Sequence, residues 1–347
     1  MKEFSYGAEN GRARRVKLRD VARHAGVSAA TVSRAIAQPE LVNSATLARV
    51  RSSAARLGYV PDGAARALAS GRSMTVGAVV PTLDSAIFSK ALQTMQATLS
   101  RHGYQLLVAS HDYSAAAEAE AIRTLLSRGV DGVMLVGAER PVGTWQLLED
   151  AGVAVVLTWC GDTRYKSVVV DNEQAGRLAA QHLIELGHKR FGVIIGAQQF
   201  NDRQRARLSG IQAALLDAGL ELPEWRVSEQ PLTLAGGRTG CSLMLALEDP
   251  PTALIGGIDL LAIGCIEEAH SRGLVVPVNI SVVGIDNIEM SAHLFPSLTS
   301  VHLPVGRIGD DAANCLLEEL AGVSANTIIE LPIELVARKS SARLACP

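Results

Sequence analysis

Side chains that bind phosphate groups are concentrated at the beginning of the chain. Residues 1–72 carry thirteen Lys or Arg against five Asp or Glu, so their net charge is +8, whereas residues 73–347 have a net charge of −10. Lysine and arginine neutralise the phosphates of DNA and release its counterions, while an acidic surface is repelled by the same polymer. We therefore expect the first segment to bind nucleic acid and the rest of the 347-residue chain to bind a different ligand.

The stretch after Val27 combines small hydroxyl side chains with one arginine, which suits a helix lying in a DNA groove. Ser28 is placed to cap that helix, and Arg34 can bind guanine O6 and N7 or hold a phosphate. Alanine offers a base only apolar contact, for example with a thymine methyl group. Three side chains are expected to face the major groove: Ala29, Ala30 and Arg34. Three others are expected to lie nearer the phosphates: Ser28, Thr31 and Ser33.

The helices that would position these side chains are visible as apolar periodicity. Leu18, Val21, Ala22 and Ala25 recur at the spacing of one helical face, and Gly26 ends that pattern. Helices are expected over residues 18–25, 29–36 and 44–57, of which the first two form a helix-turn-helix. The expected parts of the chain are a basic arm (1–16), a DNA-binding domain (17–60), a hinge (61–74) and a large domain (75–347).

The large domain alternates apolar strands with helix-period segments, which is typical of parallel sheets covered by helices on both faces. Strands are expected near 76–80, 104–109 and 132–136, and a second set is expected from Val168 onward, at 191–195, 253–256 and 281–285. The fold class is therefore a small all-α helix-turn-helix domain followed by an α/β domain of two doubly wound parallel-sheet lobes. The expected lobes are residues 75–172 with 304–330, and residues 173–303 with 331–347.

A cleft between two such lobes is a natural binding site, because open parallel sheets bind ligands at the carboxyl ends of their strands. Asp286 follows an apolar strand and can accept hydrogen bonds from hydroxyl groups there. Arg207 offers a planar donor fork for hydroxyls or a carboxylate. Alternatives stay open: Arg207 could form a surface ion pair, and Asp84 and Asp171 suit either ligand contact or turn capping.

Other classes of protein are disfavoured by what the sequence lacks. It has no P-loop, no Ser-His-Asp or Cys-His set placed by a motif, and no G-x-G-x-x-G after the first strand; Gly236-Gly237 and Gly256-Gly257 are interpreted as turns. The five cysteines are far apart, so no metal site or disulfide framework is expected. A polar start and the lack of an apolar run of about 18 residues favour a cytoplasmic protein without a membrane segment. We expect no catalytic residue and no cofactor.

Several motifs together resemble one family of bacterial regulators. The stretch Leu18-Arg19-Asp20-Val21-Ala22-x-x-Ala25-Gly26-Val27-Ser28-x-x-Thr31-Val32-Ser33-Arg34 is similar to the N-terminal signature of the LacI/GalR family. Later motifs similar to that family include Arg207-Leu208-Ser209-Gly210 and Ser281-Val282-Val283-Gly284-Ile285-Asp286. The resemblance implies a repressor that binds a pseudopalindromic double-stranded operator as a homodimer and is controlled by a small effector between the lobes. We expect a dimer, since the last residues lack a heptad repeat that would join dimers into a tetramer.

The resemblance also assigns roles to the hinge. The stretch Leu57-Gly58-Tyr59-Val60-Pro61-Asp62, followed by residues 65–70, is similar to the family's hinge, which forms a short helix on the operator. It implies that Arg66 and Leu68 contact DNA, with Leu68 as an apolar wedge in the minor groove. The alternative is that Leu68 packs on the first domain.

A set of effector-binding residues follows from the same resemblance. Residues matching Arg207 and Asp286 bind the effector in that family, an aromatic residue matching Phe88 stacks on it, and position 159, here Trp159, lines the pocket. The alternative for Trp159 is a place in the core. Asp84 and Asp259 complete the expected set.

The identity of the effector is less constrained. Relatives commonly have Asn-Asp where this chain has Ile258-Asp259, which removes one polar side chain. The stretch Val80-Pro81-Thr82-Leu83, with Phe88 after it, resembles the gluconate-responsive branch of the family and favours a sugar acid, with a neutral sugar second. A purine- or phosphosugar-responsive regulator and a stand-alone sugar-binding protein are the alternatives.

Overall fold

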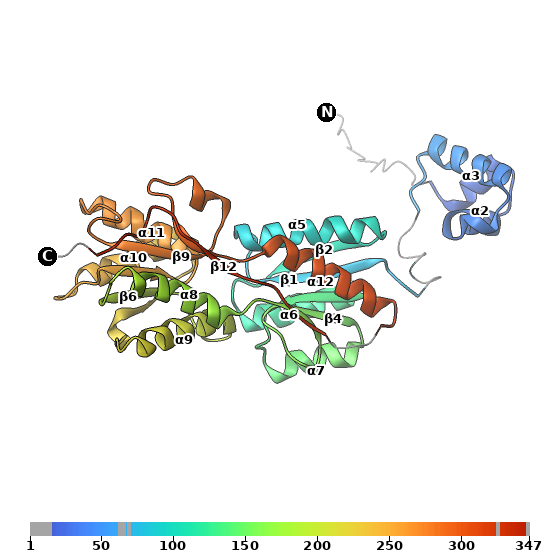
Figure 1. Cartoon of the computed structure of the whole chain (residues 1–347). Helices are drawn as coiled ribbons and strands as arrows, with labels where there is room; N and C mark the ends of the chain where they lie inside the picture. The colour runs from blue at the N-terminus through green and yellow to red at the C-terminus, as the bar shows by residue number, and fades with distance from the viewer. Residues whose placement is uncertain (1–15, 62–66, 68–70, 324–326, 345–347) are drawn as a thin grey trace, which may run out of the picture. The chain divides into compact units, whose positions relative to one another are not determined.

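The computed structural model describes residues 16–61, 67, 71–323 and 327–344. The chain divides into two compact units, Met1–Ser73 and Met74–Pro347. Figure 1 shows a cluster of short helices in the first unit and two α/β lobes in the second. Arg66 and Leu68 lie outside the described residues, so their contacts with DNA stay predictions.

Three helices around a small apolar core form the first unit. They are Leu18–Ala25 (α1), Ala29–Ala37 (α2) and Ser44–Leu57 (α3), with a short 3₁₀ turn at Pro39–Leu41 (η1). Val21, Val32 and Val50, one from each helix, are buried together in that core. Both α1 and α3 end at a glycine with positive φ, Gly26 and Gly58, because glycine adopts this left-handed conformation without a steric penalty. The predicted helix-turn-helix is confirmed.

The first lobe of the second unit is built on a six-stranded parallel sheet. In spatial order its strands are Ile328–Glu330 (β11), Lys166–Val169 (β5), Ala154–Trp159 (β4), Gly132–Val136 (β3), Thr75–Val80 (β1) and Gln105–Ser110 (β2). One face packs against Ala86–Arg101 (α5) and Val305–Leu320 (α12). The other face packs against Ala115–Ser127 (α6) and Val142–Ala151 (α7).

The second lobe repeats this architecture. In spatial order its strands are Glu334–Val336 (β12), Thr299–His302 (β10), Ser281–Asp286 (β9), Ala253–Gly256 (β8), Phe191–Ile195 (β6) and Val227–Glu229 (β7). Only β12 is antiparallel to its neighbour. One face of this sheet packs against Asn172–Glu185 (α8) and Asp202–Asp217 (α9), and the other face packs against Leu234–Leu245 (α10) and Asp259–Ser271 (α11). Short 3₁₀ turns lie at Glu224–Arg226 (η2) and Glu289–Ala292 (η3).

The chain passes between the lobes three times, from β5 to α8, from β10 to α12 and from β11 to β12. Each sheet is therefore assembled from segments that are far apart in the sequence. The predicted fold class, a helix-turn-helix with two parallel-sheet lobes, is confirmed.

Two glycines allow the backbones of α8 and α9 to come into contact. A β-carbon on Gly176 would collide with the carbonyl oxygen of Arg207, and one on Gly210 would collide with the carbonyl oxygen of Glu173. Interiors are close-packed and yield little to an added methyl group. The two glycines therefore fix the position of Arg207 against α8.

Two expectations about local structure are wrong. The strand at Val168 is β5 and belongs to the first sheet, whereas it was expected to begin the second set of strands. Gly236-Gly237 is not a turn but part of the first turn of α10, where a β-carbon on Gly237 would collide with the backbone of Leu261 on α11. The glycine pair was misread because close helix packing and chain reversal select the same residue type.

Candidate nucleic-acid interface and interlobe cleft

Helix α2 presents a narrow accessible face. The Ser28 hydroxyl accepts a hydrogen bond from the Thr31 amide at 3.0 Å and so caps the helix. Ser28, Ala30, Ser33 and Arg34 are exposed, whereas Thr31 is half-buried. Ala29, expected to face a groove, is half-buried and packs against the core of the unit. Arg34 is therefore the long polar side chain that this face offers to a base edge.

Positive side chains surround the three helices. Those of the described segment 16–61 are all exposed: Lys17, Arg19, Arg23, Arg34, Arg49, Arg51 and Arg56. The same segment has two acidic residues, Asp20 and Glu40, and Asp20 lies 3.6 Å from Arg23. The excess of exposed positive charge suits the phosphate backbone of a nucleic acid.

A cleft of about 950 Å³ lies between the two lobes of the body. Its lining comes from the segments that follow β1, β2, β6, β7 and β8, at the carboxyl ends of both sheets; it includes Thr82, Asp84, Ser85, Asp112, Tyr113, Asn201, Glu229, Thr233, Ile258 and Leu260. Cavities of several hundred Å³ at this edge of parallel sheets bind small molecules. The cleft thus has the size and the position of a small-molecule site.

Arg207 is almost completely buried, with 1% of its surface exposed. Its Nε donates to Oδ1 of Asn172 at 3.0 Å, and its Nη1 donates to the carbonyl oxygen of Gly257 at 2.6 Å. The same Nη1 lies 3.3 Å from Oδ1 of Asp286. The alternative of a surface ion pair is therefore wrong, and Arg207 joins α8, the end of β8 and the end of β9.

Asp286 closes the end of β9 in an unusual backbone conformation, with φ of 125°. Such conformations are uncommon for residues other than glycine and collect at binding sites. Burial raises the pKa of its carboxyl group to about 7, although the Arg207 charge opposes this shift; the Asp259 charge adds to it. Asp286 is therefore a mixture of carboxylate and carboxylic acid near neutral pH.

The two predicted aromatic residues contact each other. The rings of Phe88 and Trp159 meet edge to face, with centroids 5.1 Å apart and an interplanar angle of 76°. Both side chains are buried in the core of the first lobe. The indole N–H of Trp159 is nevertheless buried without a hydrogen-bond partner. Trp159 thus belongs to the core through its ring and retains one unused donor.

Further buried polar atoms lack hydrogen bonds in the same region. Oδ1 of Asn201, which lines the cleft, has no partner, and Oδ1 of Asp286 accepts no hydrogen bond. Both ring nitrogens of His111, just beyond the end of β2, are also buried without a partner. Buried polar groups are nearly always hydrogen-bonded in folded proteins. Unpaired donors and acceptors near one cleft therefore indicate that a polar ligand supplies their partners.

The remaining acidic residues of the predicted set have different positions. Asp84 is exposed and lines the cleft. Asp171 caps α8 by accepting a hydrogen bond from the Gln174 amide at 2.8 Å. Asp259, expected to bind the effector, is completely buried.

The contacts of Asp259 explain its burial. Its carboxylate accepts hydrogen bonds from the Ile288 amide at 2.9 Å, the Ser291 hydroxyl at 2.6 Å and the Ser300 hydroxyl at 2.5 Å. These bonds hold the loop after β9 and strand β10 against the first turn of α11. The structure therefore gives Asp259 a supporting position behind Asp286 in place of the expected contact with a ligand.

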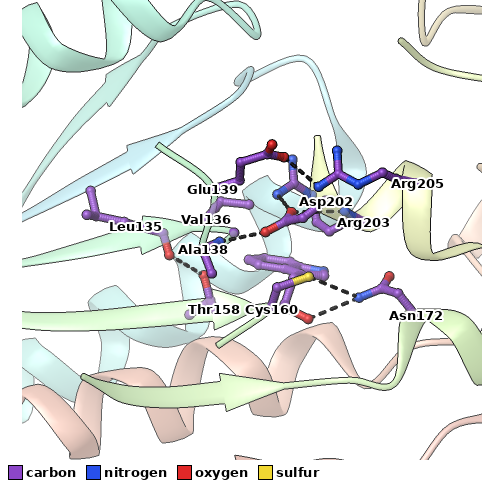
Figure 2. A network of polar contacts seen from close by, with 12 residues as sticks. Leu135, Val136, Ala138, Glu139, Thr158, Cys160, Asn172, Asp202, Arg203 and Arg205 are labelled. Carbon is purple, nitrogen blue, oxygen red and sulfur yellow. Dashed lines mark hydrogen bonds and ion pairs between the residues drawn. The ribbon is translucent and has the colours of Figure 1, made fainter. Parts of the chain in front are cut away.

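Polar contacts connect the lobes beside the cleft (Figure 2). Oδ2 of Asp202, at the start of α9, accepts a hydrogen bond from the Ala138 amide of the first lobe at 2.6 Å. Arg205 donates to Oε2 of Glu139 at 2.7 Å. The loop after β3 and the first turn of α9 thus form a direct link between the lobes.

Comparison with known proteins identifies both units of the chain. Residues 17–62 match the bacterial regulatory proteins of the lacI family, and residues 180–341 match a periplasmic binding protein-like domain. The HTH-type transcriptional repressor PurR of Aliivibrio salmonicida is 32% identical over 332 residues, covering 94% of this chain and 99% of the relative. This chain belongs to the lacI family.

Solved structures of other regulators resemble this lacI-family protein. A lac repressor dimer bound to operator and the anti-inducer ONPF is 28% identical, with a TM-score of 0.84 over 94% of this chain and 99% of that one. The complex of the regulator CelR with cellobiose is 30% identical, with a TM-score of 0.71 over 94% of this chain and 100% of that one. The lacI-family protein is thus a DNA-binding transcriptional regulator and not an enzyme. Within the described residues, no helix is long and apolar enough to cross a membrane.

Four polar residues in or beside the cleft were missed by the sequence analysis. Tyr113 and Asn201 line it, and His111 and Arg203 are each two positions away from one of these in the chain. They follow the ends of β2 and β6, so their position after an apolar strand was the signal that could have found them. Asp112 and Tyr113 both have positive φ, which the sequence does not show. Arg203 lies in a charged stretch of the sequence, residues 202–207, yet it is 7% exposed.

Proposed function

We propose that this lacI-family regulator is a repressor that binds a pseudopalindromic operator as a homodimer and is controlled by a small sugar or sugar acid bound between the lobes of residues 75–347. The observation that carries the proposal is the pairing of an exposed, positively charged helix-turn-helix with a cleft near which buried donors and acceptors have no partner. The helix-turn-helix binds DNA, and the cleft with its unpaired groups requires a polar ligand.

The DNA-binding half of the proposal assigns two kinds of contact. Arg34 reads a base edge and Ala30 makes apolar contact, while Ser28, Thr31 and Ser33 lie near phosphates. Ala29 contributes to packing as well as to the groove surface. In the hinge, Arg66 contacts DNA and Leu68 enters the minor groove. The lac repressor relative, whose structure is a dimer bound to operator, supports two-fold binding of a pseudopalindrome.

The effector half of the proposal places hydroxyl groups at the end of β9. Asp286 accepts from ligand hydroxyls through Oδ1, which accepts no hydrogen bond from the protein, and its ion pair with Arg207 holds it in place. Asp84 contributes from the opposite lobe, and Ile258 provides an apolar wall. A sugar acid is the first choice and a neutral sugar the second; the CelR relative bound to cellobiose supports a carbohydrate ligand.

Control of DNA binding follows from the position of the cleft. A ligand that touches both lobes favours one arrangement of the lobes over others, and it acts only through its different affinities for the DNA-competent and incompetent states. The contacts of Asp202 with Ala138 and of Arg205 with Glu139 belong to one such arrangement. Changing that arrangement would change how the two hinges of a dimer meet the operator.

The proposal is tested by selecting an operator from random DNA with the full chain and then titrating the complex with ligands, using fluorescence anisotropy. We expect a pseudopalindromic sequence to be selected and a sugar acid or sugar to change the affinity for it. Release or tightening by a purine alone would contradict the carbohydrate assignment. Failure of the full chain to select any sequence would favour the alternative of a stand-alone sugar-binding protein.

A further inference from the structure

We propose that Arg203 binds an anionic group of the effector, so that the regulator recognises a sugar acid or a sugar phosphate in preference to a neutral sugar. The inference rests on the proposed function, because it assigns a chemical class to the ligand of the interlobe cleft. It moves the anion from Arg207 to the arginine one turn nearer the start of α9.

The donors of Arg207 are largely in use. Nε is bound to Asn172 and Nη1 to the carbonyl oxygen of Gly257, while the charge is paired with Asp286. A carboxylate or phosphate binds arginine best through two parallel N–H groups on different nitrogens. Only Nη2 of Arg207 has no hydrogen bond to a described residue. Arg207 is therefore a positioning residue for Asp286, with little capacity for an anion.

Arg203, in contrast to Arg207, has few of its side-chain donors in use. Its side chain is about nine-tenths buried, and its Nη1 donates to Oδ1 of the adjacent Asp202 at 2.9 Å. That carboxylate is shared, because it also accepts from the Arg203 amide and from the Ala138 amide of the other lobe. Nε and Nη2 of Arg203 make no hydrogen bond to any described residue. The guanidinium thus keeps two nitrogens available for an oxyanion.

The guanidinium of Arg203 reaches the first lobe. A β-carbon on Gly137, directly after β3, would collide with its Nη1, and φ of that glycine is +78°. Figure 2 shows Arg203 close to Ala138 and Asp202, where the lobes meet. An anion held by Arg203 therefore lies at the junction of the two lobes.

Two side chains of the first lobe surround the same region. Tyr113 lines the cleft, and its pKa is raised by burial while the charges of Arg203, Asp286 and Arg207 act on it. The pKa of His111 is lowered to about 4 by burial and by the Arg203 and Arg140 charges, so its ring is neutral at pH 7. A neutral imidazole carries one N–H, and neither ring nitrogen has a partner. An oxyanion beside Arg203 would supply the missing acceptor.

The carboxylates paired with the three buried arginines differ in their other contacts. Arg140 is neutralised by Glu118 at 3.1 Å, and Arg203 shares Asp202 with two amides. The counterion of Arg207 is Asp286, which is partly protonated at neutral pH because its pKa is about 7. Asp202, the carboxylate paired with Arg203, thus also serves two backbone amides, which leaves Nε and Nη2 of Arg203 for a further acceptor.

The test compares acids with neutral molecules of the same skeleton by isothermal titration calorimetry on the full chain at pH 7. Gluconate is paired with sorbitol, in which the carboxylate is replaced by an alcohol, and glucose 6-phosphate is paired with glucose. The variants are Arg203→Gln, which removes the charge, and Arg203→Lys, which keeps it. Arg177→Gln is the control. Arg177 lies on the neighbouring helix α8, where it forms an ion pair with Asp217 at 2.5 Å, so this variant also removes a paired arginine.

We expect one acid to bind at least about tenfold more tightly than its neutral partner, as a charge-assisted hydrogen bond implies. Arg203→Gln should abolish that preference, Arg203→Lys should keep part of it, and Arg177→Gln should leave it unchanged. A preference for gluconate over sorbitol would identify a carboxylate ligand, and a preference for glucose 6-phosphate over glucose would identify a phosphate ligand.

A neutral member that binds as well as its acid, or a preference that survives Arg203→Gln, would overturn the inference and leave the proposed function intact. If none of the four molecules binds, the inference is refuted, whereas the proposed function is decided separately by the operator titration. Tryptophan fluorescence shows whether the variants are folded. If Arg203→Gln does not fold, a preference in Arg203→Lys as strong as that of the wild type would overturn the inference.

Discussion

Nη1 of Arg207 lies 3.3 Å from Oδ1 of Asp286, and both side chains are buried at the base of the second lobe. The pair joins two elements that are 79 positions apart in the chain, helix α9 and the end of strand β9. Because Nη1 also holds the Gly257 carbonyl, the arginine cannot follow a ligand without breaking contacts with its own lobe. The pair is a preformed anchor, which reduces the entropic cost of binding.

Arg34 and Arg51 separate base recognition from phosphate binding. Both are exposed, Arg34 on the accessible face of α2 and Arg51 on α3. Arg34→Ala should cost about 1–3 kcal/mol at one operator position and relax selectivity there, whereas Arg51→Ala should weaken all sequences alike. Anisotropy titrations with the selected operator, its single-base variants and random DNA measure both effects. Equal losses on operator and random DNA for Arg34→Ala would reduce that residue to a phosphate contact.

Gly176 should be intolerant of a side chain. Gly176→Ala places a methyl group against the carbonyl oxygen of Arg207, so we expect the body to lose about 3 kcal/mol of its free energy of unfolding and to bind the effector more weakly. Gly143→Ala is the matched control, since nothing lies within 4 Å of its β-carbon in α7, and it should gain at most about 1 kcal/mol. Urea unfolding followed by tryptophan fluorescence reports on the body, which contains all three tryptophans. Similar stabilities of the two variants would show that α8 and α9 separate easily.

Asp286 should make the stability of the body depend on pH. Its pKa is about 7 in the folded chain against an ordinary 3.8, so between these values the folded chain keeps a proton that the unfolded chain has released. The free energy of unfolding should therefore fall as pH rises toward 7. His111, whose pKa is lowered to about 4 from 6.5, has the opposite effect over pH 4 to 6.5.

The difference between wild type and Asp286→Asn isolates the contribution of Asp286. Urea unfolding at pH 5, 6, 7 and 8 should show wild type losing stability relative to this variant as pH rises, with little further change above pH 7. A constant difference across that range would mean that Asp286 is ionised throughout.

Phe295 should lie in the interface of the homodimer. It is 92% exposed, more than the other large apolar side chains described, and contact with a second subunit would remove this apolar surface from water. Phe295→Asp should convert the dimer to a monomer at micromolar concentration, as measured by light scattering. Val142→Asp, at an 82% exposed position on α7, should leave the dimer intact. A stable dimer of Phe295→Asp would show that a different surface joins the subunits.

Local sequence patterns determined the elements of this protein. The spacing of Leu18, Val21 and Ala22 predicts α1, and the serine at position 28 predicts the start of α2, because helix period and capping depend on residues within one or two turns. Alternating strands and helices likewise predict the two lobes. The end of β9 also identifies Asp286 as a residue at the carboxyl edge of a sheet.

Tertiary packing decided which side chains can still bind a ligand. Helical periodicity shows Arg203 and Arg207 as arginines one turn apart on α9, and only the resemblance of Arg207-Leu208-Ser209-Gly210 to a family motif separates them in the sequence. The structure brings Asn172, Gly257 and Asp286, from three separate segments, to Arg207 alone. Burial then gives Asp286 a pKa of about 7, and the packing leaves Nε and Nη2 of Arg203 without partners among the described residues, because desolvation and hydrogen bonding depend on distances through space. Periodicity in the sequence carries no information about those distances.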